Sequence, residues 1–287
     1  MTPEQYCQEK TAKSGSSFYY SFLFLPKKKR KAITALYAFC REVDDIADSE
    51  MDNNIKKVKL EWWRTEIENL FNGSPHHPVS HALAPAIEQY QLKKQYFLEI
   101  IDGMEMDLKA VRIANFEELN LYCYRAAGVV GLLSATIFGF KNEKTLEYAK
   151  TLGLALQLTN IIRDVYEDSL RNRIYLPKDE LEKYNVTEAN IFNRENTDNF
   201  QEMMRFQAER AHEYYQQAFK LLPIEDRYQQ KTGTIMAAIY ENTLNEMEID
   251  NLQVLKHKVI IPPPRKIFIA LKTFFNEWWH YRKIKAV

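Results

Sequence analysis

Turn-forming residues are scarce in this sequence, which has only 8 glycines and 10 prolines among 287 residues. Together they make up about 6% of the chain, roughly half of the proportion that is usual in globular proteins. Stretches of strand length that alternate polar and apolar residues are nearly absent as well. Because a fold of many short strands needs frequent turns, this composition favours long helices.

The sequence also lacks an excess of charge of either sign, because 39 Lys and Arg residues balance 39 Asp and Glu residues. A nucleic-acid partner has no overall electrostatic support, and we expect none. The 3 cysteines, Cys7, Cys40 and Cys123, are spaced neither for a zinc site nor for a disulfide framework. Since the N-terminus carries no secretory pattern either, we expect a cytoplasmic protein.

No uncharged run in the sequence has the length of a membrane span. The longest, Ala126 to Phe140, has 15 residues. As a helix it would be roughly 22 Å long, against a hydrocarbon layer of about 30 Å. We therefore expect a buried core helix in which Gly128 and Gly131 permit close packing.

Helical periodicity, by contrast, returns along most of the chain. No internal repeat or low-complexity linker divides the sequence, so residues 1–287 are predicted to form one all-α domain. Its helices are expected to pack around a central hydrophobic cavity. The predicted helices cover residues 27–49, 54–71, 80–91, 94–109, 116–139, 143–170, 198–221, 227–249 and 264–284.

An acidic pair lies on the apolar side of the helix predicted over residues 27–49. Asp44 and Asp48 continue a stripe that includes Tyr37 and Cys40, since these positions advance by three or four residues. The Cβ atoms of residues four apart on a helix are separated by roughly 5–6 Å. Two carboxylates that face a core are costly unless a cation meets them. Taken alone, the pair also fits a solvated helix end.

A second polar stripe lies in the helix predicted over residues 143–170. Gln157, Asn160, Asp164 and Asp168 fall within an arc of about 80°, beside a strongly apolar face. Two helices with inward carboxylates would repel each other across a cavity unless divalent cations lay between them. Carboxylate and amide oxygens, completed by water and a substrate phosphate, are typical Mg²⁺ ligands.

Magnesium in such a cavity would suit the ionisation of an allylic diphosphate, because bound ions neutralise the leaving group. Arg41, Arg163 and Arg173 are candidates for phosphate contacts, although each also fits a surface arginine. Aromatic faces can stabilise a carbocation without trapping it. Residues 18–24 and Tyr37 supply such rings, which by themselves are also typical of an ordinary core.

Four ordered motifs together resemble the squalene/phytoene synthase family. Residues 44–48 read DDIAD, residues 122–128 read YCYRAAG, residues 160–168 read NIIRDVYED, and residues 173–177 read RIYLP. The resemblance covers nearly the whole chain, and four motifs in this order are far more specific than one aspartate-rich string. Tyr166 departs from the family pattern, in which a small residue is expected there.

This resemblance implies an all-α isoprenoid-synthase fold with two facing aspartate helices. It places Tyr122 near the reacting carbons, but leaves open whether Tyr122 or released diphosphate accepts the proton. It also implies that Mg²⁺ binds the catalytic aspartates and one amide, namely Asp44, Asp48, Asn160, Asp164 and Asp168. The substrate contacts that it implies are Ser16, Ser17, Phe18, Tyr37, Arg41, Gln157, Arg163, Arg173, Tyr175 and Tyr240.

Within the family, residues 15–22, 101–107 and 235–240 are most similar to bacterial presqualene diphosphate synthases of hopanoid pathways. This likeness implies the head-to-head condensation of two farnesyl diphosphates, ending after one ionisation. The alternatives are a phytoene synthase that acts on geranylgeranyl diphosphate, a squalene or dehydrosqualene synthase with a second ionisation, and a non-catalytic binder of prenyl lipids. The sequence has no dinucleotide fingerprint, so NADPH is not expected.

The C-terminal segment, residues 264–285, combines aromatic and basic residues, and Glu277 is its sole acid. One interpretation is a last helix that packs on the bundle. The other is a helix that lies on an anionic membrane surface, which would make the protein peripheral on the inner face of the membrane. The sequence gives no indication of the oligomeric state.

Overall fold

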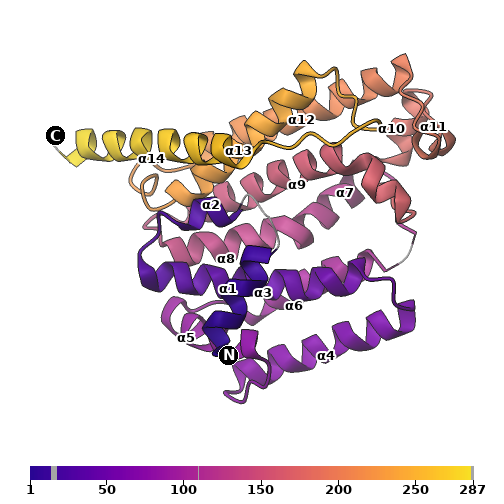
Figure 1. Ribbon diagram of the computed structural model, residues 1–287. Helices are drawn as coiled ribbons and strands as arrows, with labels where there is room; N and C mark the ends of the chain where they lie inside the picture. Colours follow the sequence, from indigo (N-terminus) through magenta and orange to yellow (C-terminus); the bar gives the residue numbers. More distant parts are fainter. Residues whose placement is uncertain (14–17, 109, 286–287) are drawn as a thin grey trace.

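A computed structural model describes residues 1–13, 18–108 and 110–285, and this part of the chain is built from helices (Figure 1). Within these ranges the only β-type pairing is an isolated parallel bridge between Arg112 and Ile174. The all-α prediction is therefore confirmed. The helices, in chain order, are α1 (Pro3–Lys13), α2 (Phe18–Phe22), α3 (Lys27–Asp48), α4 (Asn53–Phe71), α5 (Pro78–Tyr90), α6 (Lys94–Met106), α7 (Phe116–Cys123), the π-helical turn η1 (Tyr124–Gly128), α8 (Val129–Phe138), α9 (Lys144–Leu170), α10 (Lys178–Lys183), α11 (Glu188–Phe192), α12 (Asp198–Leu221), α13 (Lys231–Ile249) and α14 (Pro263–Lys285).

Each segment predicted to be helical is helical, with ends that differ by up to four residues. The segment predicted over residues 116–139 differs internally, because η1 interrupts it with a π-helical turn. The short helices α1, α2, α10 and α11 were not predicted. Helices α2, α10 and α11 have only five or six residues, too few for an apolar stripe to repeat. Helix α1 has 11 residues but buries only Cys7 and Thr11, so it lacks an apolar stripe.

The helices bury two apolar cores that lie on either side of one cavity. One core joins α9, α12 and α13, and the other joins α3, α4, α5, α6 and α8. Phe18 and Ala126 pack against both cores. In Figure 1, α9 crosses the middle of the molecule, with α12 and α13 above it and α3, α6 and α8 below. The acidic segments of α3 and α9 therefore come from different halves of the fold.

Close packing of α9 against η1 and α8 depends on two glycines. A Cβ atom at Gly131 would lie 2.3 Å from the carbonyl oxygen of Ala149. A Cβ atom at Gly153 would lie 2.6 Å from the carbonyl oxygen of Ala127. The prediction for Gly131 is thus confirmed, whereas the role predicted for Gly128 belongs to Gly153. An added Cβ at Gly128 would mainly meet side-chain atoms, the nearest at 3.3 Å.

By length and composition alone, one described helix, Phe116–Phe138, could cross a membrane. Half of its most apolar window is buried inside the fold. Ala126, Ala127 and Val130 line the central cavity, and Gly131 packs against α9. These contacts are those of a core helix, as the sequence predicts for residues 126–140.

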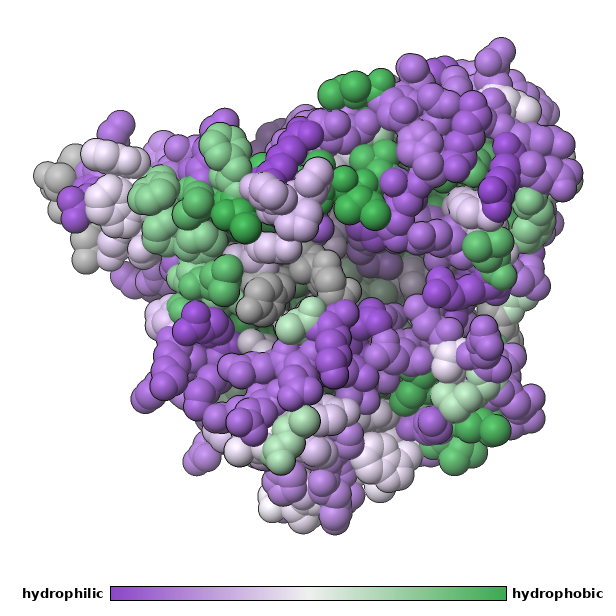
Figure 2. All heavy atoms as spheres, viewed as in Figure 1, coloured by the Kyte–Doolittle hydropathy of each residue, from purple (hydrophilic) through white to green (hydrophobic). Residues whose placement is uncertain are grey.

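Helix α14 extends from the bundle, and its two sides have different surroundings (Figure 1). One side packs inward, with Phe274 stacked on Phe24 and Glu277 paired with Arg227. The other side carries exposed apolar residues, among them Phe268 and Trp279. Figure 2 shows apolar side chains gathered over this part of the molecule. Both sequence interpretations of this segment are therefore compatible with the fold, since each concerns a different side of the helix.

Candidate active site

A cavity of about 630 Å³ opens between the two cores, where Figure 2 shows the surface hollowed near its centre. Its lining follows one side of each long helix around it, because residues three or four apart share a helix face. On α3 this side consists of Tyr37, Cys40, Arg41, Asp44 and Asp48. On α9 it runs through Tyr148, Leu152, Leu156, Gln157, Asn160, Arg163, Asp164 and Asp168, and on α13 through Gly233, Met236, Tyr240 and Thr243.

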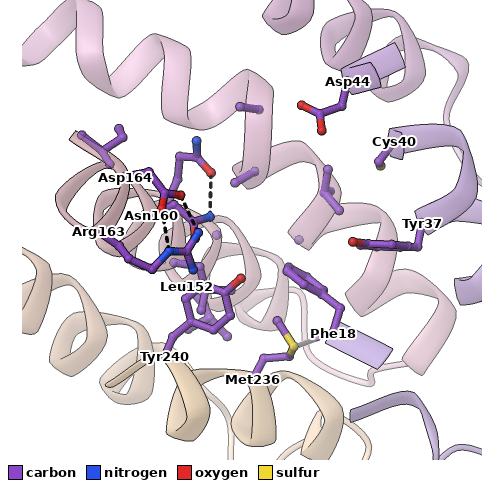
Figure 3. Close-up of a pocket in the computed structure, with 18 of the residues that line it drawn as sticks. Phe18, Tyr37, Cys40, Asp44, Leu152, Asn160, Arg163, Asp164, Met236 and Tyr240 are labelled. Carbon is purple, nitrogen blue, oxygen red and sulfur yellow. Dashed lines mark hydrogen bonds and ion pairs between the residues drawn. The ribbon is translucent and has the colours of Figure 1, made fainter. Parts of the chain in front are cut away.

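The two predicted acidic stripes lie on opposite walls of this cavity. Figure 3 shows Asp44 across the pocket from Asn160 and Asp164. Asp48 and Asp168 line the same space from α3 and α9. Asp44 and Asp48 are partly exposed, but they face this cavity rather than the outer surface of a solvated helix end. Burial raises the pKa of Asp44 to about 6, although Arg41 opposes that shift.

Arginines hold the carboxylates of α3. The guanidinium of Arg41 donates to both Asp44 and Asp45. Arg173 donates through Nη1 to Asp48 Oδ1 at 2.6 Å and through Nη2 to the carbonyl oxygen of Ala47 at 2.8 Å. Arg173 is buried and lines the cavity, so it is not a surface arginine.

The carboxylates of α9 have contrasting environments. Arg163 donates to Asp164 at 2.8 Å and 2.5 Å, and Lys258 Nζ lies 2.9 Å from Asp164 Oδ1. Burial raises the pKa of Asp164, but these cations outweigh it and hold the pKa below its usual value. Burial and the charge of Asp164 raise the pKa of Asp168 to about 7, with Arg173 opposing the shift.

An aromatic wall adjoins the acidic region. The ring of Phe18 lies 5.6 Å from that of Tyr37 and 6.1 Å from that of Tyr240 (Figure 3). These three residues come from α2, α3 and α13, so the wall joins the two halves of the fold. Asn160 Nδ2 donates to Gln157 Oε1 at 3.3 Å on the neighbouring face of α9.

Asp107, at the end of α6, is a buried site residue that the sequence reasoning missed. It accepts hydrogen bonds from Tyr122 Oη at 3.2 Å and from Tyr175 Oη at 2.6 Å. The two tyrosine rings stack with centroids 4.7 Å apart. Burial raises the pKa of Asp107 to about 6, although both tyrosines oppose the shift. In the sequence, Asp107 is marked only by its position, because this acidic residue directly follows the apolar stripe of a predicted helix.

Tyr122 lies in the last turn of α7, two residues before the π-helical turn η1, a type of irregularity that is frequent at functional sites. Burial and the neighbouring Asp107 raise the pKa of Tyr122 well above its ordinary value, so its phenol is protonated at neutral pH. Tyr122, Tyr175 and Asp107 all line the cavity. Together they form a hydrogen-bonded group beside the acidic region.

Ser16 and Ser17 lie outside the described residues. Tyr166 is not among the described residues that line the cavity, and the guanidinium carbon of Arg194 lies 3.8 Å from the centre of its ring. Tyr166 therefore forms no part of the cavity wall.

Comparison with known proteins identifies the family. Residues 11–265 match the family model described as squalene/phytoene synthase. The chain belongs to the squalene/phytoene synthase family. Such proteins are prenyltransferase-type enzymes that act on prenyl diphosphates and generally use Mg²⁺.

Relatives within this family carry different names. A phytoene synthase of Arthrospira platensis is 35% identical over 277 residues, which cover 91% of this chain and 89% of that protein. A dehydrosqualene synthase crystal structure matches with a TM-score of 0.85 and 26% identity, covering 99% of this chain and 97% of that one. The squalene synthase HpnC from Alicyclobacillus acidocaldarius matches with a TM-score of 0.78 and 25% identity, covering 87% and 94%.

The charges in this squalene/phytoene synthase cavity suit a complex of Mg²⁺ and diphosphate. Among the described residues, no three His, Cys, Asp or Glu side chains converge to hold a metal ion by themselves. Magnesium commonly binds through one or two carboxylates and completes its shell with water and phosphate oxygens. Among the described residues that line the cavity, acidic and basic side chains are equal in number, six of each: Asp44, Asp48, Asp107, Asp164, Glu167 and Asp168, against Arg41, Arg163, Arg171, Arg173, Lys258 and Lys266.

Arg171, Lys258, Lys266 and Glu167 had not been predicted as site residues. Lys258 follows α13 in a segment without helical periodicity, and Lys266 lies near the start of α14. Their positions depend on how these segments fold back over the cavity. A regular stripe in the sequence could not have identified these two lysines, whereas Glu167 and Arg171, three and seven residues after Asp164, continue the stripe of α9.

Proposed function

We propose that this protein condenses two farnesyl diphosphates head to head to give presqualene diphosphate, with release of diphosphate. The observation that carries the proposal is the joint placement of both acidic stripes and the aromatic wall on one cavity. The rest of that cavity is lined mainly by apolar side chains, which suit two prenyl chains. The farnesyl substrate is favoured by the similarity of residues 15–22, 101–107 and 235–240 to bacterial presqualene diphosphate synthases.

The acidic end of the cavity is the proposed diphosphate site. Bound Mg²⁺ would supply Lewis-acid neutralisation of the diphosphate leaving group. Arg41, Arg163 and Arg173, which now neutralise carboxylates, would turn to phosphate oxygens once those carboxylates bind ions. The residues proposed to hold the ions are Asp44, Asp48, Asn160, Asp164 and Asp168.

The aromatic wall would protect the carbocation. When the C1–O bond of the first farnesyl diphosphate breaks, its electron pair leaves with diphosphate and an allylic cation remains. The rings of Phe18, Tyr37 and Tyr240 can face this cation without forming a bond to it. The π electrons of the 2,3 double bond of the second molecule then form the new bond to C1.

Cyclopropane closure requires the loss of one proton from that former C1, whose C–H electrons form the last ring bond. We propose that Tyr122 Oη receives this proton while its own proton passes to Asp107 Oδ2, 3.2 Å away. The exchange avoids both a phenolate and a protonated phenol. Asp107 can accept the proton because, with a pKa of about 6, it is mostly ionised at neutral pH.

Product analysis tests the proposed reaction. Purified protein would be incubated with farnesyl or geranylgeranyl diphosphate and Mg²⁺, without and with NADPH. We expect presqualene diphosphate from farnesyl diphosphate, no product after chelation of divalent ions, and none from Asp44→Asn or Asp164→Asn. A variant that kept its lipid affinity without any magnesium requirement would instead indicate a non-catalytic prenyl-lipid binder. Squalene or dehydrosqualene as the end product would show a second ionisation.

Phytoene formation from geranylgeranyl diphosphate is the second candidate function. It is favoured by the 35% identity to a phytoene synthase over 91% of the chain. The chemistry and the assigned residues are the same, and only the chain length and the second ionisation differ. A clear preference for geranylgeranyl diphosphate, with phytoene as product, would replace the farnesyl proposal.

We also propose that the exposed side of α14 contacts the inner face of the cytoplasmic membrane. Phe268, Phe275 and Trp279 are 66%, 52% and 58% exposed, and basic residues flank them. Such a face suits anionic headgroups. The cavity lining includes Ile260 and Lys266, so the helix begins beside the substrate site.

Vesicle sedimentation tests this contact. Vesicles of phosphatidylglycerol should bind the protein more strongly than vesicles of phosphatidylcholine, and added salt should weaken the binding. The pair of substitutions Phe275→Ser and Trp279→Ser should abolish it. Val58→Ser, which changes an exposed residue of α4, is the control. Equal binding by the double variant would exclude the proposed surface.

A further inference from the structure

One end of the cavity lies far from the acidic residues, and Tyr148 is there. Tyr148 and Asp164 belong to the same lining stripe of α9, 16 residues apart. At the helical rise per residue this separation is about 24 Å. Among the described lining residues of α9, none precedes Tyr148. On the neighbouring helices the lining reaches Phe138, the last residue of α8, and Gln230, just before α13.

Tyr148 fills the space between α9 and α13 at this end. Its side chain is fully buried, and its hydroxyl lies against the backbone of Gly233, where an added Cβ would come within 2.9 Å of Oη. The ring of Phe219 lies behind it, with the centroids 6.3 Å apart. Tyr148 is therefore packed from α9 to α13, and the volume of its ring separates the cavity from Phe219.

The hydroxyl of Tyr148 contributes no hydrogen bond to this arrangement. It is buried and has no partner among the described residues. An unpaired buried hydroxyl costs free energy, so its removal should not weaken the packing. The volume of the ring and the chemistry of the hydroxyl can thus be tested separately.

We propose that Tyr148 sets the longest prenyl chain that the cavity accepts, because its ring blocks the path of the chain end. This proposal rests on the proposed function in one respect, namely that the diphosphate binds at the acidic end. The chain then extends along α9 past Leu156 and Leu152 toward Tyr148. One further isoprene unit adds four chain bonds, roughly 5 Å from carbon–carbon bonds of about 1.5 Å. A phenol ring occupies a comparable length.

The test is a chain-length profile of wild type, Tyr148→Ala and Tyr148→Phe. For each protein, kcat/KM would be measured with geranyl, farnesyl, geranylgeranyl and geranylfarnesyl diphosphates. We expect Tyr148→Ala to raise the preference for the substrate one isoprene unit longer than the wild-type optimum by at least about 10-fold. Tyr148→Phe keeps the ring and should keep the wild-type profile.

Two further variants separate this effect from a loss of stability. Tyr148→Leu removes less volume, so it should fold where the Ala variant does not and shift the profile less. Phe97→Ala truncates a fully buried ring of the other core that is not a lining residue. It should lower the melting temperature without changing the profile. Unchanged profiles in both the Ala and Leu variants, or an equal shift in Tyr148→Phe or Phe97→Ala, would overturn the proposal.

The design distinguishes a failure of this proposal from a failure of the proposed reaction. A wild-type preference for geranylgeranyl diphosphate would overturn the farnesyl assignment, and the Tyr148 variants would then be compared with geranylfarnesyl diphosphate. Equilibrium binding of the unreactive S-thiolodiphosphate analogues gives the same length profile without turnover. It therefore tests Tyr148 even if wild type forms no product from any of the four substrates.

Discussion

Replacing Asp107 by Asn should change the pH dependence of stability in a calculable way. Asp107 is 6% exposed, and burial raises its pKa from 3.8 to about 6 in the folded protein. Because the folded-state pKa is raised, the stabilising contribution of this group is complete below pH 3.8. It is lost as the pH rises through about 6. A difference of about two pKa units corresponds to about 3 kcal/mol in total.

Asparagine resembles the protonated acid in shape but does not titrate. The stability difference between wild type and Asp107→Asn therefore isolates this one group from the other titrating residues. Between pH 4.5 and 7.5, the free energy of unfolding of wild type should fall by about 2 kcal/mol relative to that of Asp107→Asn. Urea unfolding of both proteins across this range measures it. A difference that stays constant, or that changes with the opposite sign, would refute the assignment of a raised pKa to Asp107.

The same substitution should lower the rate of the reaction, although it removes the cost of burying a charged carboxylate. If Asp107 accepts the proton through Tyr122, Asp107→Asn should lower kcat by about 10²-fold or more, within the range of general acid–base catalysis. Its KM for the substrate should change little, since Asp107 is assigned no phosphate contact. Tyr175→Phe removes the other hydrogen bond to Asp107 and is the matched control. An equal loss of kcat in both variants would indicate a role in packing rather than in proton transfer.

Three other perturbations test the geometry of the site. In thermal unfolding, Gly153→Ala should destabilise the protein by about 1–3 kcal/mol, because the added Cβ would meet a backbone carbonyl. Gly128→Ala should cost less in this assay. Arg173→Leu leaves Asp48 with Arg171 alone, 4.0 Å away, and should lower stability by about 2–4 kcal/mol in urea unfolding. This loss is smaller than that for a fully buried pair because Asp48 is partly exposed. Arg163→Lys keeps the charge but loses the fork of donors to Asp164, so kcat should fall while stability changes by less than about 1 kcal/mol.

The acidic stripes could be predicted because each lies on one helix. Asp44 and Asp48 on α3, and Asp164 and Asp168 on α9, have faces that follow directly from helical periodicity. The two stripes then had to share a cavity, since a buried carboxylate needs a cation or another charged group. Local geometry and the cost of burial were sufficient for this part of the site.

The partners of those carboxylates depend on contacts between distant segments. Arg173 and Asp48 are separated by 125 residues, and Lys258 reaches Asp164 from the segment after α13. Asp107 belongs to the site because α6 ends beside Tyr122 and Tyr175. None of these pairs has a fixed spacing, because loop paths rather than helix periodicity bring them together. The sequence could therefore indicate the acidic stripes but not the arrangement of charges around them.

That arrangement has a consequence for the order of binding. Within the described part of the chain, the six acidic and six basic side chains of the lining balance each other, so they contribute little net charge to the cavity. A diphosphate alone would add negative charge to a region where burial already raises the pKa of Asp44 and of Asp168. Cations alone would compete with Arg41 and Arg163 for the same carboxylates. Joint entry of diphosphate and cations preserves the balance, because uncompensated charge is costly where water is excluded.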